Sequence, residues 1–464
     1  MNEAVVVGLD FGSSRIKAAA YGRDGALVAA RSVATPIRST PDGDDFLVLD
    51  MLDAAASVIA ELGCPAGSIA ALGTSSMGEV GTILADGGLA DLAFPSWYDH
   101  RGGEIVAQLE RAWGADSLRL STGNHLRLAS TVAKLGHLAS TRELPGGIFL
   151  GLCGALAWQL TGRGWQEAGL AVTSGVYDGT RRRYLEHVWE TGGLGGIALP
   201  PVESPGHAES ASTALALALG LGQGAPVVIA GHDHPVASVG AGVRSGELSD
   251  SMGTGEALIA VMDSALAADP AHRAVALAVD PYVSFEVWPT TGELLVVWER
   301  MRPGLAMRSF VEYSGVDRDE LDAGAPASSL GTLVTEETSL AMENGDPGGL
   351  PPTPESWAEL IDFYVLLANR GQEIVRSVTN ADGATVLTGG GLRSRRWRQA
   401  KAVMGRAPMV VSTVEETATR GCAAMAGVAA GWWAAAQSMP GGERVPIGAD
   451  AIADMEAAIT RMTP

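Results

Sequence analysis

The sequence is poor in cysteine and lysine, and each shortage excludes a class of site. Its three cysteines, Cys64, Cys153 and Cys422, are widely spaced, which argues against a disulfide framework or a structural zinc site. Lysine also occurs only three times in 464 residues. Arginine side chains and backbone N–H groups are therefore the expected contacts for any phosphate.

Basic charge and long apolar runs are scarce as well. The formal net charge of −21 argues against nucleic acid and anionic membrane surfaces as partners, since both need a basic face. The longest apolar stretches, Ala214–Leu221 and Ala423–Ala436, are too short or too rich in Gly and Ala to span a bilayer. The first residues lack the basic and apolar segments of a secretory signal, so we expect a cytoplasmic protein.

The composition is otherwise that of a globular protein large enough for several domains. Hydrophobic residues make up 47% and charged residues 18% of the chain, which is typical of a well-packed rather than a disordered protein. At 464 residues the chain exceeds one ordinary core, so two or three domains are expected.

Both halves of the chain begin with the same local pattern. Val5–Leu9 and Ile16–Tyr21 are predicted strands joined by a tight turn, because β-branched and apolar residues flank Gly and hydroxyl residues. Leu248–Met252 and Ala257–Met262 repeat this strand, turn and strand. The repeat predicts a duplicated α/β domain with a cleft between the copies. We expect domains over residues 1–245 and 246–436, with a helical tail over 437–464.

Further elements follow from hydrophobic periodicity and from Gly and Pro. The predicted helices are Leu49–Leu62, Gly103–Trp113, Ala129–Ser140, Ala211–Leu219, Glu355–Val378 and Ala449–Met462. The predicted additional strands are Leu27–Ser32, Ile69–Thr74, Pro226–Ala230 and Val386–Thr388. Asn344–Pro354 is predicted to be a surface loop, and Ser394 is predicted to cap a helix that ends at Gly405.

Four glycine-bearing turns each follow an apolar strand. They lie at Asp10–Ser14, Ser75–Gly81, Met252–Gly255 and Gly389–Gly391. Because ligands of parallel α/β sheets bind at the carboxyl ends of strands, these turns are expected to line one cleft. Glycine also simply permits tight turns, and a chain with 60 glycines supplies several of them. That ordinary alternative stays open.

The first of these turns has the chemistry of a phosphate site. Its backbone N–H groups and the hydroxyls of Ser13 and Ser14 can face a phosphate. Asp10 ends the preceding strand and is suited to hold Mg²⁺, directly or through water, because hard cations prefer oxygen ligands. From these residues alone, an ordinary hairpin with an exposed aspartate is the alternative.

Asp233 follows a buried strand and is flanked by His232 and His234. A carboxylate in such a place can accept a proton from an attacking hydroxyl, hold a metal, or cap the next helix. The His-Asp-His spacing lacks the i, i+4 separation of a helical zinc site, and no third ligand follows. General base and structural cap both remain open at this point.

Glu79 and the segment Trp97–Arg101 are candidates for binding a substrate. Sugars are bound by planar aromatic side chains against their C–H faces, with carboxylates accepting hydrogen bonds from their hydroxyls. Core packing is the alternative for Trp97 and Tyr98. The Arg181–Arg183 run is interpreted as a solvated surface.

Over nearly its whole length the chain resembles the FGGY carbohydrate kinases, members of the actin/hexokinase/heat-shock ATPase superfamily. Leu9–Lys17 resembles the first phosphate motif and Ser251–Gly255 the second. Trp97–Arg101 is similar to the family's Trp-x-Asp-x-Arg segment, and Ala230–Asp233 stands where the family has its catalytic aspartate. Leu387–Ser394 is similar to the start of the adenosine region, which continues through Trp397-Arg398-Gln399 to Ala418–Ala426.

The resemblance implies two ribonuclease-H-like domains with a deep cleft between them. It implies ATP with Mg²⁺ as cofactor and a small ketose, such as a pentulose or hexulose, or a polyol as the phosphate acceptor. Asp233 would be the general base, and Asp10 and Asp233 would bind the metal. A homodimer is an expectation at the level of the family.

The resemblance also assigns the remaining binding residues. The substrate would be held by Glu79, Trp97, Asp99, Asp233 and His234. The nucleotide would be held by Gly12, Ser13, Ser14, Lys17, Gly253, Thr254, Gly255, Gly389, Gly390, Gly391 and Ser394.

Two departures from the family pattern concern the substrate. The turn after Ile69–Thr74 reads Ser76-Met77-Gly78-Glu79, where xylulokinases have Gln-Met-His-Gly and glycerol kinases an Arg-Glu pair. His234 stands where many relatives have Asn or another small polar residue. Both positions belong to the substrate shell, so they leave the reaction intact and the identity of the sugar open.

Two other functions are compatible with the same motifs. One is an ATP-gated binding module, in which closure is the output and hydrolysis resets it. The other is a degenerate family member that binds sugar without transferring phosphate. Asp10 and Asp233 speak against the degenerate member, and Asp233 with Glu79 and Asp99 favours the kinase.

Overall fold

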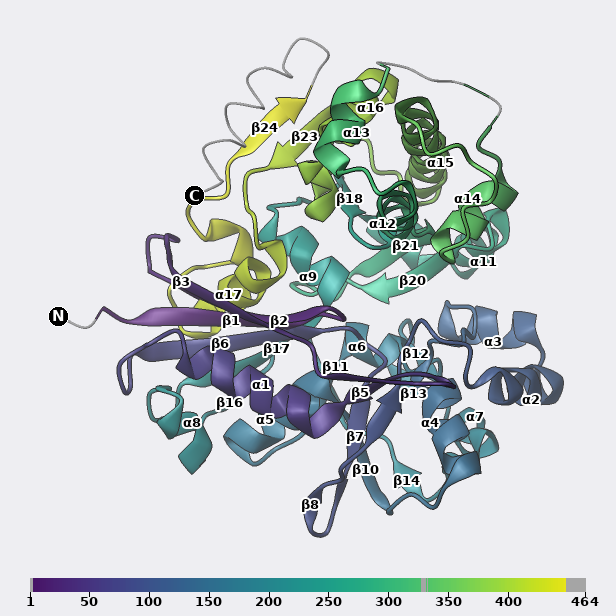
Figure 1. Cartoon of the computed structure of the whole chain (residues 1–464). Coiled ribbons are helices and arrows are strands. Elements are labelled where there is room, and N and C mark those ends of the chain that lie inside the picture. Colours follow the sequence, from purple (N-terminus) through teal and green to yellow (C-terminus); the bar gives the residue numbers. More distant parts are fainter. Residues whose placement is uncertain (1–2, 327–330, 332, 448–464) are drawn as a thin grey trace. The chain divides into compact units, whose positions relative to one another are not determined.

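The computed structural model describes residues 3–326, 331 and 333–447 (Figure 1). By their contacts these residues form two compact units. The N-terminal unit comprises the chain up to Gly240, Ser284–Leu294 and Glu416–Gly441. The C-terminal unit comprises Ala241–Val283, Leu295–Glu415 and the residues from Gly442 on. Among the described residues, no helix has the length and apolar character needed to cross a membrane.

The N-terminal unit is built on a six-stranded sheet. Its order is β16 (Ala208–Ser210), β17 (Pro226–His232), β6 (Ile69–Ser76), β1 (Val5–Phe11), β2 (Arg15–Tyr21) and β3 (Leu27–Ala34). Strand β1 pairs with β2 in an antiparallel hairpin and with β6 in parallel, and β6 pairs with β17 in parallel. The carboxyl ends of three neighbouring parallel strands therefore lie at one edge of this sheet.

The C-terminal unit repeats this topology. Its sheet has the order β21 (Leu294–Met301), β19 (Glu256–Val261), β18 (Leu248–Met252), β22 (Thr385–Thr388), β23 (Met409–Ser412) and β24 (Arg444–Ile447). Strand β20 (Val283–Val287), apart from Val283, belongs to the N-terminal unit. Strands β18 and β19 form the antiparallel hairpin, and β18, β22 and β23 run parallel, as β1, β6 and β17 do. The duplicated α/β domain predicted from the sequence is confirmed.

Helices surround both sheets (Figure 1). Those of the N-terminal unit are α1 (Val48–Ala60), α2 (Gly103–Trp113), α3 (Ala115–Thr122), α4 (Thr131–Thr141), α5 (Leu152–Thr161), α6 (Ala168–Val172), α7 (Glu186–Trp189), α8 (Ala214–Ala218), α9 (Asp233–Gly240) and α17 (Thr417–Ala429). Those of the C-terminal unit are α10 (Ser264–Ala268), α11 (Pro270–Val279), α12 (Pro303–Ser314), α13 (Arg318–Gly324), α14 (Glu336–Glu343), α15 (Pro354–Thr379) and α16 (Arg395–Met404).

The N-terminal unit also holds smaller sheets. One is formed by β4 (Ile37–Thr40), β5 (Gly43–Leu47) and β9 (Ala93–Pro95), and another by β14 (Ile197–Ala198), β10 (Gly147–Gly151), β7 (Gly81–Ala85) and β8 (Gly88–Leu89). Two strand pairs complete it, β11 (Gln166–Glu167) with β15 (Val202–Glu203) and β12 (Tyr177–Asp178) with β13 (Arg183–Tyr184).

Helix α17 packs on the N-terminal sheet although it lies near the end of the chain. Gly8 and Gly73 face each other in the pairing of β1 with β6, and both lie directly under the backbone of α17. A Cβ atom on Gly8 would collide with the Thr419 carbonyl, and one on Gly73 with the Cys422 carbonyl. Two glycines in register thus let the helix approach the sheet closely. Glu416–Gly441 therefore belongs to the N-terminal unit, whereas the sequence analysis assigned residues 416–436 to the second domain and 437–441 to the helical tail.

Most predicted elements are present, and the differences have local causes. The predicted helix Ala211–Leu219 begins later, as α8, because the Thr213 side chain accepts a hydrogen bond from Ala216 N and caps it. Ala211 N donates instead to Ala225 O, in an extended segment. The long helix α15 begins after its N-cap Thr353, and its C-cap Asn380 adopts a left-handed conformation (φ 65°).

The end of the chain also differs from prediction. Residues 444–447 form strand β24, paired with β23, within the segment 437–464 that was predicted to be helical. The alternating pairing of Met409 with Ile447 and Val411 with Val445 adds this strand to an existing sheet edge. The predicted helix Ala449–Met462 lies outside the described residues.

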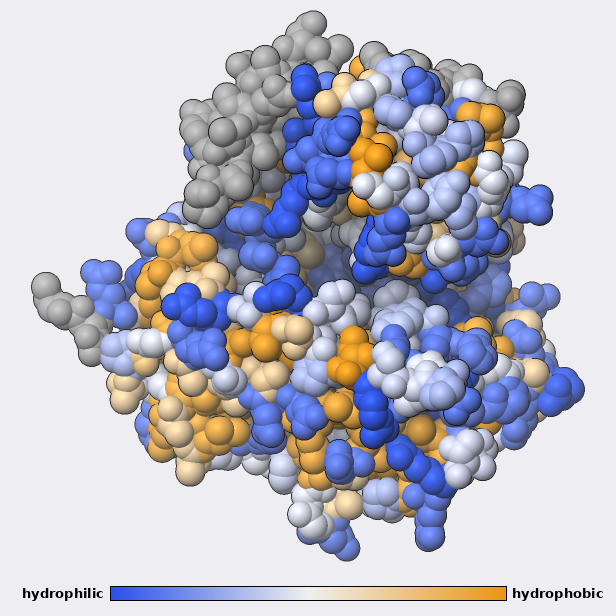
Figure 2. Space-filling view, in the orientation of Figure 1, coloured by the Kyte–Doolittle hydropathy of each residue, from blue (hydrophilic) through white to orange (hydrophobic). Residues whose placement is uncertain are grey.

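Apolar side chains are exposed on the edge strand β3. Leu27 is 57% and Val28 is 62% exposed. Figure 2 shows hydrophobic residues gathered on the side of the N-terminal unit where β3 and α17 lie. This surface is separate from the strand ends described next.

Candidate active site

Three strand ends bring the predicted catalytic aspartate, Asp233, and the predicted metal ligand Asp10 together. Asp10 on β1 pairs in register with Ser75 on β6, and Ser75 pairs in register with Gly231 on β17. Asp233 follows two residues after Gly231, as the first residue of α9. Asp10 and Asp233, which are 223 positions apart in the sequence, thus lie near the same edge of one sheet.

Asp10 is a buried carboxylate with one hydrogen-bond donor. Its side chain accepts a hydrogen bond of 2.7 Å from the Ser75 hydroxyl, and the residue is 8% exposed. Burial, followed by the nearby charge of Asp233, raises the pKa of Asp10 to about 7. A carboxylate whose pKa is raised by burial and by a second carboxylate nearby marks a site that favours a cation.

The turn after Asp10 is stabilised by hydrogen bonds to Gly12. Gly12 N donates to Arg15 O at 3.1 Å, and the Thr35 hydroxyl donates to Gly12 O at 2.7 Å. A Cβ on Gly12 would lie 2.8 Å from the Arg15 carbonyl oxygen, so the tight turn requires glycine. Ser13 is half-buried and Ser14 is exposed. Their hydroxyls are accessible at this turn.

The Lys17 side chain forms an ion pair within the N-terminal unit. Its Nζ lies 2.7 Å from Glu416 Oε2, and both side chains are about one-third exposed. This ion pair ties β2 to the residue before α17. Lys17 is thus an ion-paired cation three residues after the turn Asp10–Ser14.

Asp233 is surrounded by histidines and carboxylates. His234 N donates to Asp233 Oδ1 at 2.7 Å, and His232 Nε2 lies 3.4 Å from the same oxygen. His232 Nδ1 lies 3.0 Å from Glu286 Oε2. The rings of His232 and His234 meet edge-on at 6.0 Å. These contacts bring a residue from the middle of the chain, Glu286, to the predicted catalytic aspartate.

Glu79 belongs to the same cluster. It follows β6, and the Thr131 hydroxyl of α4 donates to its backbone carbonyl at 3.0 Å. Burial raises the pKa of the Glu79 carboxyl, and the charges of His232 and Arg127 oppose that rise. The structure therefore brings Asp10, Glu79, Asp233 and His234 to one region.

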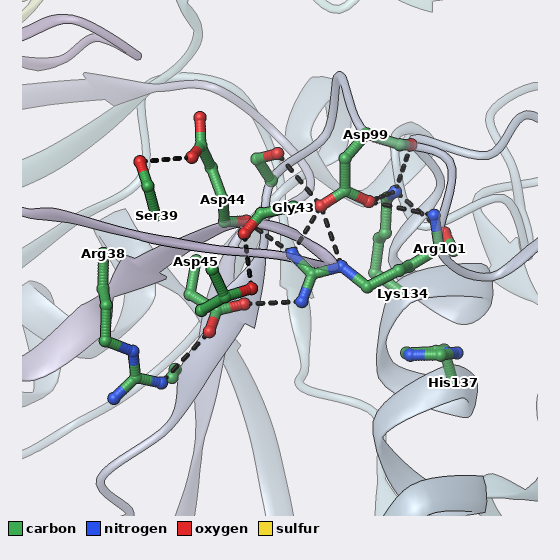
Figure 3. Close-up of polar contacts among 12 residues, drawn as sticks. Arg38, Ser39, Gly43, Asp44, Asp45, Asp99, Arg101, Lys134 and His137 are labelled. Carbon is green, nitrogen blue, oxygen red and sulfur yellow. Dashed lines mark hydrogen bonds and ion pairs between the residues drawn. The ribbon is translucent and has the colours of Figure 1, made fainter.

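Asp99 lies in a dense ion-pair network (Figure 3). Its Oδ1 accepts hydrogen bonds from Arg101 N at 3.0 Å and Lys134 Nζ at 2.9 Å, and its Oδ2 from Arg101 Nε at 2.9 Å and Ser96 Oγ at 3.2 Å. Arg101 also reaches Asp45 at 2.7 Å. Burial favours the neutral form of Asp99, but the effect of these donors is larger than that of burial. The pKa of Asp99 is therefore lowered. The carboxylate is thus largely saturated by the protein itself.

Lys134 connects this network to Glu79. The ammonium is completely buried and donates to the Asp99 and Arg101 carbonyls, at 2.8 and 2.9 Å, besides the Asp99 carboxylate. Burial lowers the pKa of Lys134, although the charges of Asp99 and Glu79 act in the opposite direction. Asp99 is thus placed one side chain away from Glu79. Trp97 is half-buried beside it, with its ring edge-on to Tyr98 at 5.4 Å.

The C-terminal unit places its two glycine turns side by side. Ser251 on β18 pairs in register with Thr388 on β22, so the turns that follow these strands are neighbours. Gly253 N donates to Gly255 O at 2.9 Å, which closes the first turn. Thr254 O accepts from Leu305 N of α12 at 3.2 Å. The four turns are thus paired, two in each unit, and their meeting in one cleft stays a prediction.

The second turn of this unit is built on glycines with distinct constraints. Gly389 has a φ of 93°, and a Cβ there would lie 2.6 Å from the Met252 carbonyl oxygen. A Cβ on Gly391 would lie 2.5 Å from the Trp397 ring, whereas a Cβ on Gly390 would meet nothing within 4 Å. Gly390 is therefore the open position of the three.

Ser394 has a structural partner on each side. Its hydroxyl accepts a hydrogen bond from Trp397 N at 3.1 Å, which confirms the predicted helix cap, and donates to Asp322 Oδ2 at 3.0 Å. Asp322 also accepts from Trp357 Nε1 at 2.8 Å. The Ser394 hydroxyl is thus engaged within the C-terminal unit.

Several charged residues at these sites were missed by the sequence analysis. Lys401 is completely buried, 2.6 Å from Asp250 and 2.5 Å from Glu256. Asp250 lies on β18, which leads into the Gly253–Gly255 turn, and Glu256 directly follows that turn. Glu286 and Glu167 are buried beside His232. The sequence contains a signal for Glu286, because this acid interrupts the apolar segment Val283–Val287. An acidic side chain on a buried strand needs a polar partner, so a partner for Glu286 could have been predicted.

Comparison with known proteins agrees with this architecture. Residues 5–240 match the model of the "FGGY family of carbohydrate kinases, N-terminal domain". No curated protein sequence matches the chain. Among solved structures, a xylulose kinase from Rhodospirillum rubrum superposes with a TM-score of 0.78 at 20% identity, covering 99% of this chain and 97% of that one.

Two further solved structures share the fold. A gluconate kinase from Lactobacillus acidophilus has a TM-score of 0.77 at 16% identity, with coverage of 99% of this chain and 96% of that chain. Plasmodium falciparum glycerol kinase with ADP has a TM-score of 0.76 at 12% identity, with coverage of 99% and 97%. They establish two actin-like ATPase domains as the fold, and the family model covers more than half of the sequence. The chain therefore belongs to the FGGY family of carbohydrate kinases.

Proposed function

We propose that this kinase transfers the γ-phosphoryl group of ATP to a hydroxyl of a small ketose or polyol, with Asp233 as general base. The observation that carries this proposal is the convergence of Asp10 and Asp233 at neighbouring strand ends, where the charge of Asp233 raises the pKa of Asp10. Phosphoryl transfer depends mainly on alignment and charge neutralisation, so a pair of carboxylates beside a phosphate turn suits it.

The residues present fit Mg²⁺ that arrives with the nucleotide. Asp10 and Asp233 offer oxygen ligands, which Mg²⁺ prefers, and no group of three His, Cys, Asp or Glu side chains suited to a metal occurs in the described part of the chain. Mg²⁺ is usually held by one or two carboxylates together with substrate phosphates. When bound, it would neutralise phosphate charge.

Each unit would contribute its own nucleotide contacts. In the N-terminal unit, Gly12, Ser13 and Ser14 would offer N–H and hydroxyl groups to a phosphate, with Lys17 nearby. In the C-terminal unit, Gly253, Thr254 and Gly255 would do the same. Gly389, Gly390 and Gly391 would line the adenosine site, and Ser394 would hold the start of α16 beside them.

On the substrate side, Glu79 and His234 would contact sugar hydroxyls next to Asp233. Trp97 would offer a ring face. Asp99 already accepts hydrogen bonds from Ser96, Arg101 and Lys134, so its part in substrate binding would be to hold the segment around Trp97 in place. Because Glu79 and His234 depart from known family patterns, the substrate is proposed only as a class.

The test is ADP formation with Mg²⁺-ATP against a panel of pentuloses, hexuloses, tetritols, pentitols and glycerol. Asp233→Ala should reduce transfer by roughly 10²–10⁴-fold, the range of a general base, with ATP binding nearly intact. Asp91→Ala is the matched control, because Asp91 is an exposed carboxylate in the same unit.

The outcomes separate the alternatives. One strong responder that falls silent in Asp233→Ala would establish the kinase and name its substrate class. ADP release that no sugar stimulates would favour an ATP-gated module instead. Sugar-stimulated turnover that survives in a folded Asp233→Ala variant would show that another residue is the base.

A further inference from the structure

His232 lies between two carboxylates, with one at each ring nitrogen. Nδ1 is 3.0 Å from Glu286 Oε2, and Nε2 is 3.4 Å from Asp233 Oδ1. The His232 side chain is 15% exposed and that of Glu286 is 6% exposed. The ring is therefore held in a mostly buried position by a residue 54 positions away.

Glu286 is itself fixed by the backbone around it. Phe285 N donates to Gly123 O at 2.9 Å, and Asn124 Nδ2 donates to Phe285 O at 2.9 Å. Both hydrogen bonds lie within the N-terminal unit. The backbone of Phe285, the residue before Glu286, is thus anchored at both its N–H and its carbonyl group, which supports the fixed placement that a positioning residue requires.

The contacts define which ring atoms carry hydrogen. An ionised carboxylate only accepts hydrogen bonds, so Nδ1 donates to Glu286. Nε2 faces a second carboxylate, and this contact is favourable when Nε2 also carries a hydrogen. The ring is then a cation among the acidic side chains that face it, which are Glu79, Glu167, Asp233 and Glu286.

The two oxygens of Asp233 are not equivalent. Oδ1 accepts the hydrogen bond from His234 N and faces His232 Nε2. Within the described part of the chain, no donor contacts Oδ2. One oxygen is thus anchored by the protein, and the other is left for a ligand.

We propose that His232 and Glu286 form a positioning pair, which anchors Asp233 through Oδ1 and presents Oδ2 to the substrate hydroxyl. This inference rests on the proposed kinase function. In the step it serves, the hydroxyl proton passes to Oδ2 while the hydroxyl oxygen bonds to the γ-phosphorus of ATP. The bond between that phosphorus and the β–γ bridging oxygen breaks, and its electron pair leaves with ADP.

Two substitutions at position 232 separate the two contacts. The amide nitrogen of Gln lies near the place of His Nε2, so His232→Gln keeps a donor toward Asp233 and loses the one toward Glu286. The shorter Asn amide lies near the place of Nδ1, so His232→Asn keeps the donor toward Glu286 and loses the one toward Asp233. Glu286→Gln removes the negative charge beside Nδ1, keeps an amide oxygen that can accept its hydrogen bond, and leaves the ring in place.

The expected kinetic result is a loss in kcat with the KM for ATP within about twofold of wild type. We expect kcat to fall roughly 10–100-fold in His232→Asn, less than for loss of the base itself, and distinctly less in His232→Gln. The double variant Glu286→Gln/His232→Asn should have a kcat no lower than that of His232→Asn alone, because the two residues act as a unit. Glu293→Gln is the control, because Glu293 is an exposed acid of the same segment.

A crystal structure of His232→Asn gives a readout that does not depend on activity. The Asp233 carboxylate should turn away from its wild-type orientation there and keep it in Glu293→Gln. An unmoved Asp233, or equal kcat in His232→Asn and His232→Gln, would overturn the positioning role. If wild type phosphorylates no sugar of the panel, the proposed function fails, and the Asp233 orientation alone decides the inference.

Discussion

The Ser75 hydroxyl donates a 2.7 Å hydrogen bond to the Asp10 carboxylate across the pairing of β6 with β1. This bond favours the ionised form of Asp10, against burial and the charge of Asp233. It joins the two neighbouring strand ends at the centre of the candidate site.

Ser75→Ala should therefore raise the pKa of Asp10 further above its wild-type value of about 7. An ionised Asp10 would then need a higher pH, so the acidic limb of the profile of kcat/KM for ATP should move to higher pH. The measurement is that profile between pH 5.5 and 9 at saturating sugar. Ser76→Ala, the next buried residue of β6, is the control. A limb that stays in place would show that Asp10 is not the group that titrates.

Adjacent glycines of the adenosine turn should respond differently to alanine. In Gly391→Ala the new Cβ would lie 2.5 Å from the Trp397 ring and 2.9 Å from the Met252 side chain, so the turn must shift. We expect the KM for ATP to rise about tenfold or more, which corresponds to about 1.4 kcal/mol of lost binding. Gly390→Ala meets nothing within 4 Å and should leave the KM nearly unchanged. Equal effects of the two substitutions would argue against nucleotide binding at this turn.

The buried cation of the C-terminal unit should be a strong determinant of stability. Lys401→Met removes the partner of Asp250 and Glu256 in a completely buried cluster. Loss of one partner of a buried ion pair costs about 3–5 kcal/mol, because a charge remains buried without compensation. Denaturant unfolding of both proteins measures this cost.

The control for Lys401→Met is an exposed ion pair of the same unit. Arg406 pairs with Glu373, and their side chains are 73% and 54% exposed. Arg406→Met should cost less than about 1 kcal/mol. A cost for Lys401→Met as small as that of the control would contradict the view that the cluster holds the base of the Gly253–Gly255 turn.

Glu167 should make the protein less stable as pH rises. Burial, opposed by hydrogen bonds from Leu170 N and Gly169 N, raises its pKa to about 8. The folded state then keeps a proton that the unfolded state loses near pH 4.5, so the contribution of Glu167 falls between pH 4.5 and 8. Glu167→Gln keeps an oxygen for the two backbone donors and removes this titration.

The free energy of unfolding of Glu167→Gln relative to wild type should therefore increase from pH 5 to pH 8.5, by on the order of a few kcal/mol. Urea unfolding at both pH values measures the difference. Glu203→Gln, on the strand paired with that of Glu167, provides a partly exposed comparison. A difference between Glu167→Gln and wild type that does not change with pH would show that Glu167 is ionised in the folded protein throughout.

Local patterns were enough to predict the framework of the site. The hairpins that begin both halves, the strand ends at Asp10 and Asp233, and the Ser394 cap follow from hydrophobic alternation, glycine and capping chemistry, all of which act over a few residues. The order of the motifs along the chain then pointed to the FGGY family, which the family model confirms.

What only the tertiary structure decided are contacts between residues far apart in sequence. The sequence does not show that Glu286 meets His232, that Lys134 saturates Asp99, or that Gly8 and Gly73 lie under α17. A charged residue or a glycine within an apolar segment can be identified in the sequence. Its partner in the folded protein is determined by strand order and helix packing. Periodicity therefore determined the elements and the ends of the strands, whereas the pairing of the sheets determined which charges meet there.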